Sequence, residues 1–105
     1  MQSLTVIVVS CSLLGCASHM QLSDKSYGAK PPDAQIETVE LTQEKRKYEV
    51  LGIVSVPLVL MGPKTAVEKL KAEARKMGAD AISTPDSKYN ANNRILEAKA
   101  IRWIQ

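Results

Sequence analysis

The chain has 105 residues and a formal net charge of +3, from 14 lysines and arginines against 11 acidic residues. Every charged side chain lies beyond residue 23, and the basic ones are dispersed, without the basic stripe and interleaved aromatics that indicate nucleic-acid binding. About 90 residues follow the apolar start of the chain, enough for one small domain.

An apolar run from Leu4 to Leu14 precedes a cysteine, Cys16. Its length is typical of the hydrophobic part of a signal peptide, about 7–15 residues, although no basic side chain precedes it. A membrane-spanning helix would need about 20 apolar residues. An N-terminal strand of a cytosolic domain would not explain why no charged residue occurs before Asp24. The pattern favours a signal peptide over residues 1–15.

The motif Leu13-Leu14-Gly15-Cys16 resembles the lipobox of bacterial lipoproteins. This resemblance implies that Cys16 carries a diacylglyceryl group on its sulfur and becomes the first mature residue. In enterobacterial lipoproteins an aspartate at the next position favours retention in the inner membrane, and Ala17 stands there in this chain. The resemblance therefore implies a lipid anchor in the outer membrane, with the protein facing the periplasm.

The two cysteines leave no thiol for a disulfide in the mature protein. Cys11 would be removed with the signal peptide, and Cys16 would carry the lipid. A domain of this size without a disulfide is only marginally stable on its own. We therefore expect a homo-oligomer or a stable envelope protein partner.

Residues 16–35 are predicted to form the lipidated cysteine and a flexible tether, with a folded domain over 36–105. The tether is rich in serine and proline, and its larger apolar residues are only Met20, Leu22 and Tyr27. Such a segment buries too little surface to offset the entropy lost on ordering.

Two strands are predicted at the start of the domain. Residues 36–42 alternate, with Val39 and Leu41 inward, which indicates an edge strand. Residues 48–56 are apolar on both faces and predict a central, covered strand. Gly52 inside this run indicates a β-bulge or the close approach of another backbone.

Residues 57–63 are apolar but framed by prolines, so they cannot belong wholly to a central strand. One interpretation is a connection that packs over the end of the core. The other is an exposed hydrophobic patch that contacts a partner or the membrane, through Leu58, Val59, Leu60 and Met61.

A helix is predicted over residues 65–77. Thr65 and Glu68 fit a capping box, and Gly78 fits the left-handed residue that ends a helix. One arc of this helix is apolar and consists of Ala66, Val67, Leu70, Ala74 and Met77. Glu73 lies outside the arc and is expected to be solvated.

Three further elements are predicted after the helix. They are a short strand over residues 79–84, a polar hairpin loop over 85–94 and a last strand over 95–105. In the last strand, Ala98 and Ala100 are small enough to let the helix sit close. Trp103 points the other way and would be either covered by the chain or available to a second subunit.

These elements predict an α+β fold in the order β-β-α-β-β: a mostly antiparallel sheet of about four strands with one amphipathic helix on one face. The opposite face would carry Leu51, Ile53 and Ile101, with no predicted element to cover it. An uncovered apolar face favours self-association.

A second resemblance rests on Tyr48-Glu49-Val50-Leu51-Gly52-Ile53-Val54 and Met77-Gly78-Ala79-Asp80-Ala81-Ile82, with Leu70, Lys71 and Ala74 before the latter. This pattern is similar to that of YbjQ-like proteins and of the outer-membrane sensor lipoprotein of the Rcs stress system. The resemblance implies the fold, and for YbjQ-like proteins ring-shaped oligomers and a nominal link to metals. The core disulfides of the Rcs sensor have no counterpart in this chain.

The sequence shows no catalytic or metal-binding constellation. His19 is the only histidine and lies in the predicted tether, so the domain itself offers neither a zinc site nor a nucleophile–histidine pair. Glu37 and Glu40 are expected to be solvated, and Gly62-Pro63-Lys64-Thr65 lacks the spacing of a phosphate-binding loop. We expect no enzyme activity, no metal, no cofactor and no nucleic-acid partner.

Two functions remain as alternatives. The first is a membrane-anchored bacterial envelope lipoprotein, a non-catalytic structural or stress-sensing module that acts through protein–protein contacts at residues 58–61 or at Trp103. The second is an oligomeric domain that binds a small ligand or a metal between helix and sheet. The scarcity of ligating residues favours the first.

Overall fold

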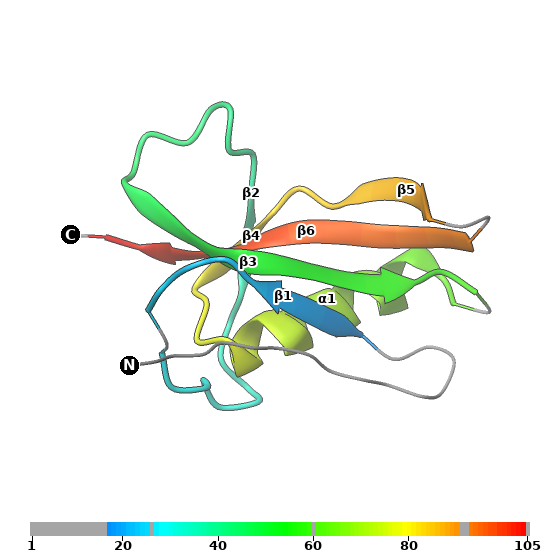
Figure 1. Ribbon diagram of the computed structural model, residues 1–105, viewed down its shortest axis with the longest axis horizontal. Coiled ribbons are helices and arrows are strands. Elements are labelled where there is room, and N and C mark those ends of the chain that lie inside the picture. The colour runs from blue at the N-terminus through cyan, green and yellow to red at the C-terminus, as the bar shows by residue number, and fades with distance from the viewer. Residues whose placement is uncertain (1–16, 26, 60, 91–92, 105) are drawn as a thin grey trace.

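The computed structural model describes residues 17–25, 27–59, 61–90 and 93–104. Within them one sheet carries a single helix on one face (Figure 1). The elements in chain order are β1 (Ser18–Gln21), β2 (Glu37–Val39), β3 (Tyr48–Pro57), α1 (Pro63–Lys76), β4 (Ala81–Ser83), β5 (Asp86–Asn90) and β6 (Asn93–Trp103). The predicted α+β class is confirmed. The predicted four strands and their order are wrong, because the sequence pattern predicts neither β1 nor β5.

The strands follow the order β1-β3-β6-β4-β2, and β5 pairs with β6 beyond the end of β4. The described pairings are antiparallel except that of β2 with β4, so the sheet is mixed. β3 lies between β1 and β6, which confirms its predicted central place. β2 lies at the edge of the sheet, as predicted, but ends at Val39.

β5 lies in the segment predicted to be a hairpin loop. It pairs with residues 93–97 of β6, and its side chains from Asp86 to Tyr89 are exposed. A strand with an exposed and mostly polar sequence has no apolar alternation, which is the signal on which strand prediction depends.

Gly52 interrupts the pairing of β3 with β6, as predicted. The register shifts between Val50, which lies opposite Ile101, and Gly52, which lies opposite Ala100. The extra residue, Leu51, is 2% exposed and packs in the cluster on the helix side. Its predicted place on the face away from the helix is wrong, because a bulge breaks the alternation of side chains along a strand.

The helix begins earlier than predicted and lacks the predicted capping box. Gly62 is the N-cap, without a side-chain cap hydrogen bond, and Pro63 is the first helical residue. Proline suits this position because its φ is already helical and it has no N–H to leave unpaired. Thr65 and Glu68 therefore lie inside the helix. Gly78 has a φ of +80°, which confirms its predicted left-handed conformation.

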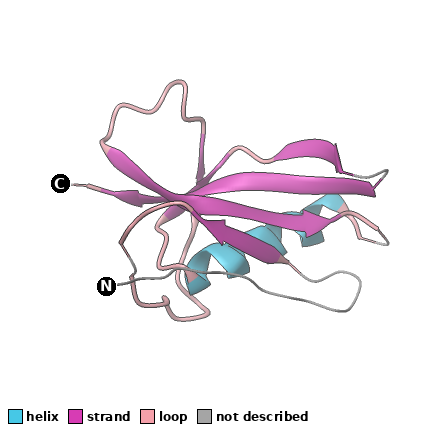
Figure 2. Cartoon of the chain, viewed as in Figure 1, coloured by secondary structure: helices cyan, strands magenta, loops and turns pink. Residues whose placement is uncertain are grey.

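The helix lies on one face of the sheet (Figure 2). The core has two parts, one on each face of the sheet. The main cluster lies between helix and sheet and comprises Ile36, Leu51, Val54, Val56, Ala66, Leu70, Ala74, Met77, Ala79, Ile82, Ala98 and Ala100. The second cluster comprises Val39, Ala81 and Ile101, with the partly buried Leu41, Tyr48, Val50 and Trp103 around it. The face predicted to be bare thus carries buried side chains, and Leu41 and Arg46 of the connection after β2 partly cover it.

Candidate functional site

β1 is the described element nearest to the predicted lipid site. Cys16 lies outside the described residues, and β1 begins at Ser18. Ser18 lies opposite Ser55 and Gln21 opposite Gly52, so the whole of β1 lies along β3. The prediction of a flexible tether is wrong for these residues, because main-chain hydrogen bonds to β3 order them without requiring many apolar side chains.

Gly52 permits the close approach of β1. A Cβ atom on Gly52 would lie 2.0 Å from the carbonyl oxygen of Met20 and 2.6 Å from the Cε of Met77. Any side chain at this position would therefore displace β1 or the end of the helix. The predicted close approach of another backbone at Gly52 is confirmed.

His19 links β1 to the helix. Its Nδ1 is hydrogen-bonded to Oε2 of Glu73, whose side chain is 7% exposed, and Lys76 Nζ donates to the other carboxylate oxygen over 3.3 Å. A buried carboxylate is costly unless it is paired. The expectation that Glu73 is solvated is wrong. Its spacing from Leu70 and Met77 (three and four residues) already places it beside the apolar arc.

The rest of the predicted tether crosses the C-terminal end of the helix. The Lys30 N–H donates to the Arg75 carbonyl over 2.8 Å, and Arg75 Nε donates to the Ala34 carbonyl over 2.7 Å. The Arg75 carbonyl, in the last turn of the helix, also accepts from the Gly78 N–H over 3.0 Å, so the Lys30 N–H is an additional donor to it. Polar contacts therefore fix a segment whose composition predicts disorder.

Asp80 joins this segment to the end of β6. Burial raises the pKa of Asp80, but hydrogen bonds from the Lys30 ammonium and the Trp103 N–H outweigh burial. Together with the charges of Lys30 and Arg102 they hold the pKa below its usual 3.8. Asp80 is thus an ionised, fully partnered carboxylate, which is the state of a structural ion pair.

Glu49, like Asp80, is a carboxylate that fixes part of the predicted tether through hydrogen bonds. Hydrogen bonds from the hydroxyls of Ser23 and then Tyr27 lower the pKa of Glu49, and the bond to Glu49 raises the pKa of Tyr27. The Arg102 guanidinium lies 4.0 Å from the centre of the Tyr27 ring. These contacts hold Ser23 and Tyr27 against the sheet and use both carboxylate oxygens of Glu49.

Residues 58–61, the first predicted contact site, lie just after β3. Leu58 and Met61 are half-buried against the main cluster, and Val59 is 40% exposed. Leu60 lies outside the described residues. The connection therefore packs over the end of the core, as one interpretation predicted, and also presents an apolar side chain to solvent.

Trp103, the second predicted contact site, lies at the other end of β3, opposite Tyr48. The Arg46 guanidinium covers its ring at 3.9 Å from the centroid. Arg46 also pairs with Glu44 over 2.7 Å and with Glu37 over 2.9 Å. Hydrogen bonds from Arg46 lower the pKa of Glu44 to about 2. Trp103 is thus partly covered by its own chain, and the two predicted contact sites do not form one surface.

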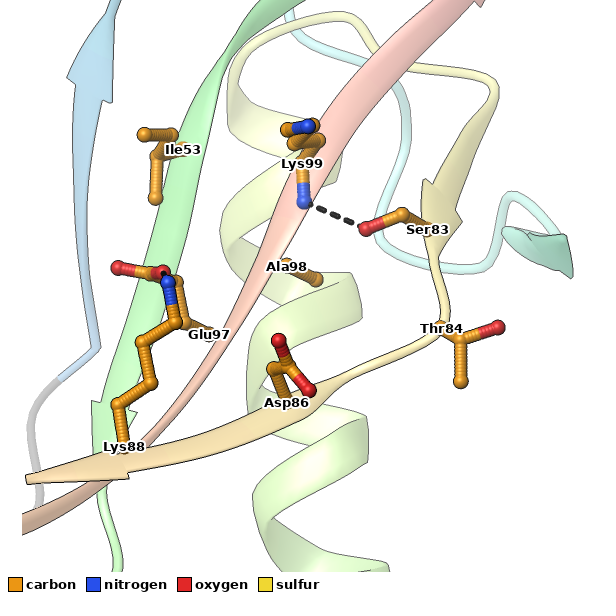
Figure 3. Close-up of a pocket in the computed structure, with 8 residues that line it drawn as sticks. All are labelled: Ile53, Ser83, Thr84, Asp86, Lys88, Glu97, Ala98 and Lys99. Carbon is orange, nitrogen blue, oxygen red and sulfur yellow. Dashed lines mark hydrogen bonds and ion pairs between the residues drawn. The ribbon is translucent and has the colours of Figure 1, made fainter. Parts of the chain in front are cut away.

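A depression of about 220 Å³ lies where β6 passes from β5 to β4 (Figure 3). In this gap the Lys99 N–H donates to Ser83 Oγ over 2.9 Å, and Lys88 pairs with Glu97 over 2.8 Å, which raises the pKa of Lys88. Ligand pockets are typically about 300–1,000 Å³ and mostly apolar. This one is smaller, lined largely by polar groups, and lies on the sheet rather than between helix and sheet.

Among the described residues, no group of three histidine, cysteine, aspartate or glutamate side chains is placed to hold a metal ion. The described helix is too short and too polar to cross a membrane. Comparison with protein-family models, curated proteins and solved structures gave no match for this chain. The resemblances to the lipobox, to YbjQ-like proteins and to the Rcs sensor therefore stay predictions.

Proposed function

We propose that this chain is a lipid-anchored lipoprotein of the bacterial cell envelope, which acts as a non-catalytic structural or stress-sensing module through protein–protein contacts. The observation that supports this most is the motif Leu13-Leu14-Gly15-Cys16 at the end of an apolar run, which resembles a signal peptide with a lipobox. β1 begins at Ser18, so a lipid on Cys16 would be attached two residues before an ordered strand. The residue after the lipobox, Ala17, favours the outer membrane on the same resemblance.

The second cluster supports a protein partner. Leu41, Tyr48, Val50 and Trp103 are only partly buried there, on the face of the sheet that lacks the helix. Partly buried aromatic residues are enriched where proteins meet. The partner is a second copy of the chain or another envelope protein.

The alternative of a small-ligand domain has weaker support. The depression beside β4 is polar and below the usual size of ligand pockets, and the space between helix and sheet is filled by the main cluster. No described group of side chains offers a metal site.

The anchor is tested by fractionation of bacteria that express the full chain, the variant Cys16→Ser and the matched control Cys11→Ser. We expect the wild type and Cys11→Ser in the membrane fraction and Cys16→Ser outside it, because only Cys16 would carry lipid. Equal membrane association of all three would contradict the proposal.

The partner contact is tested with a photo-crosslinking amino acid in place of Tyr48, with the same substitution at the exposed Lys69 as control. An adduct from position 48 at twice the mass of the chain would identify the partner as a second copy. A discrete adduct of any other mass would identify the partner as another envelope protein. The absence of adducts from position 48 in intact cells would contradict the protein–protein part of the proposal.

A further inference from the structure

The direction of β1 decides which end of the molecule lies next to Cys16. β1 runs antiparallel to β3, with Ser18 opposite Ser55, so the chain before Ser18 leads towards the end of the sheet where β3 finishes at Pro57. A residue advances the chain by at most about 3.6 Å, so the Cα atom of Cys16 lies within roughly 7 Å of that of Ser18. We call this the anchor end.

The connection after β3 and the β5–β6 hairpin meet at the anchor end. The Leu58 N–H donates to the Arg94 carbonyl over 3.0 Å, and Arg94 lies opposite Tyr89 of β5. Figure 1 shows the end of β3, the end of β5 and the start of β6 at the same end of the molecule as the start of β1. Two segments about thirty residues apart in sequence thus form one surface beside the predicted lipid.

The anchor end combines exposed apolar and basic side chains. Tyr89 is 76% exposed and Val59 is 40% exposed. Arg94, opposite Tyr89, and Lys64, at the start of the helix, are exposed as well. Residues 57–67 and 87–96 contain lysine and arginine but no aspartate or glutamate. The nearest carboxylates flank these ranges: Glu68 on the helix, which pairs with Lys71 over 3.9 Å, Asp86 on β5, and Glu97 on β6, which pairs with Lys88.

This combination matches the chemistry of a membrane surface. Tyrosine is enriched at the boundary between hydrocarbon and water, and lysine and arginine near the surface are attracted to anionic headgroups. The opposite end of the sheet differs, because the connection there mixes Glu40 and Glu44 with its basic residues. A protein partner at the anchor end would have to fit between the domain and a lipid attached within roughly 7 Å of Ser18.

We propose that the anchor end is a membrane-docking surface. Tyr89 and Val59 enter the headgroup region, and Lys64 and Arg94 contact anionic headgroups. This inference rests on the proposed lipid anchor and adds an orientation to it. Trp103 then lies at the far end of β3, a strand of ten residues and so about 30 Å from the membrane.

The test is fluorescence quenching by lipids brominated in their acyl chains. The full chain is expressed in bacteria, purified from membranes and reconstituted in vesicles of brominated phosphatidylcholine with phosphatidylglycerol. Trp103 is the only tryptophan, so the wild type reports on the far end, and the double variant Tyr89→Trp/Trp103→Phe reports on the anchor end. Tyr89→Trp with Trp103 retained is a second reporter if the double variant does not fold.

We expect the double variant to lose most of its emission, Tyr89→Trp alone to lose part of it, and the wild type to lose little. The docking surface would be overturned if the tryptophan at position 89 were not quenched, whether or not Trp103 is quenched. The mass of the N-terminal peptide from the same preparation tests the lipid anchor independently. Lipid on Cys16 without quenching at position 89 would overturn the docking surface and support the anchor. Quenching at position 89 without lipid on Cys16 would overturn the anchor and support the docking surface.

Discussion

Gly52 is the single residue on which the packing of β1 depends most directly. We expect Gly52→Ala to lower the free energy of unfolding by about 1–3 kcal/mol, the usual cost of overpacking, because its Cβ would meet the Met20 carbonyl oxygen at 2.0 Å. Urea denaturation followed by Trp103 fluorescence measures this. Gly28→Ala is the control, since a Cβ there meets nothing within 4 Å. Equal stability of the two variants would contradict the close approach.

The contact between His19 and Glu73 is the other residue-scale feature that fixes β1. We expect His19→Ala and Glu73→Gln to be coupled by about 0.5–3 kcal/mol in a double-mutant cycle, since the two side chains share a hydrogen bond at a nearly buried carboxylate. The control cycle pairs His19→Ala with Glu68→Gln, an exposed glutamate on the same helix. Additivity in the first cycle would mean that the contact does not hold β1.

At the scale of elements, the connection between β2 and β3 is organised by Arg46. We expect Arg46→Ala to raise the pKa of Glu44 from about 2 towards its usual 4.5, because the side-chain hydrogen bond from Arg46 is the largest cause of the lowering. Backbone N–H groups that also bond to Glu44 would keep the pKa somewhat below 4.5. Titration of the side-chain carboxyl by NMR measures the change.

Arg94→Ala is the matched control for Arg46→Ala, since Arg94 is exposed and lies on a different strand. It removes the same charge and is expected to leave the pKa of Glu44 unchanged. A pKa near 2 that persists in Arg46→Ala would contradict the role of the guanidinium.

Periodicity in the sequence predicted the elements that contribute most to the main cluster. β3 and the helix were identifiable because their apolar residues recur at strand and helix spacing, and the bulge because glycine interrupts an apolar run. β1 and β5 lack such a pattern and exist through pairing with distant strands. The position of Leu51 could not be predicted, since the shift in register depends on β6.

The candidate surfaces were predicted less well than the fold. The motif at Cys16 and the apolar connection over residues 58–61 could be recognised from local sequence. The contribution of Tyr89 and Arg94 could not, because their closeness to Leu58 depends on the pairing of β5 with β6 and on the hydrogen bond between Leu58 and Arg94.

At the scale of the whole molecule, only a short stretch of chain separates the proposed lipid from the folded domain. Residues 18–21 of the predicted tether are instead paired with β3, and Lys30 is hydrogen-bonded to the last turn of the helix. A lipoprotein built in this way would sit on the membrane with a defined orientation. Its second cluster, beside Trp103, would face away from the membrane towards other envelope components.

The most direct test of the proposed function is the mass of the N-terminal peptide, measured on the full chain expressed in a bacterial host and recovered from its membranes. We predict a peptide that begins at Cys16 and carries lipid. An unmodified chain that begins at Met1 would contradict the lipid anchor, and the apolar run from Leu4 to Leu14 would then need a place in the fold.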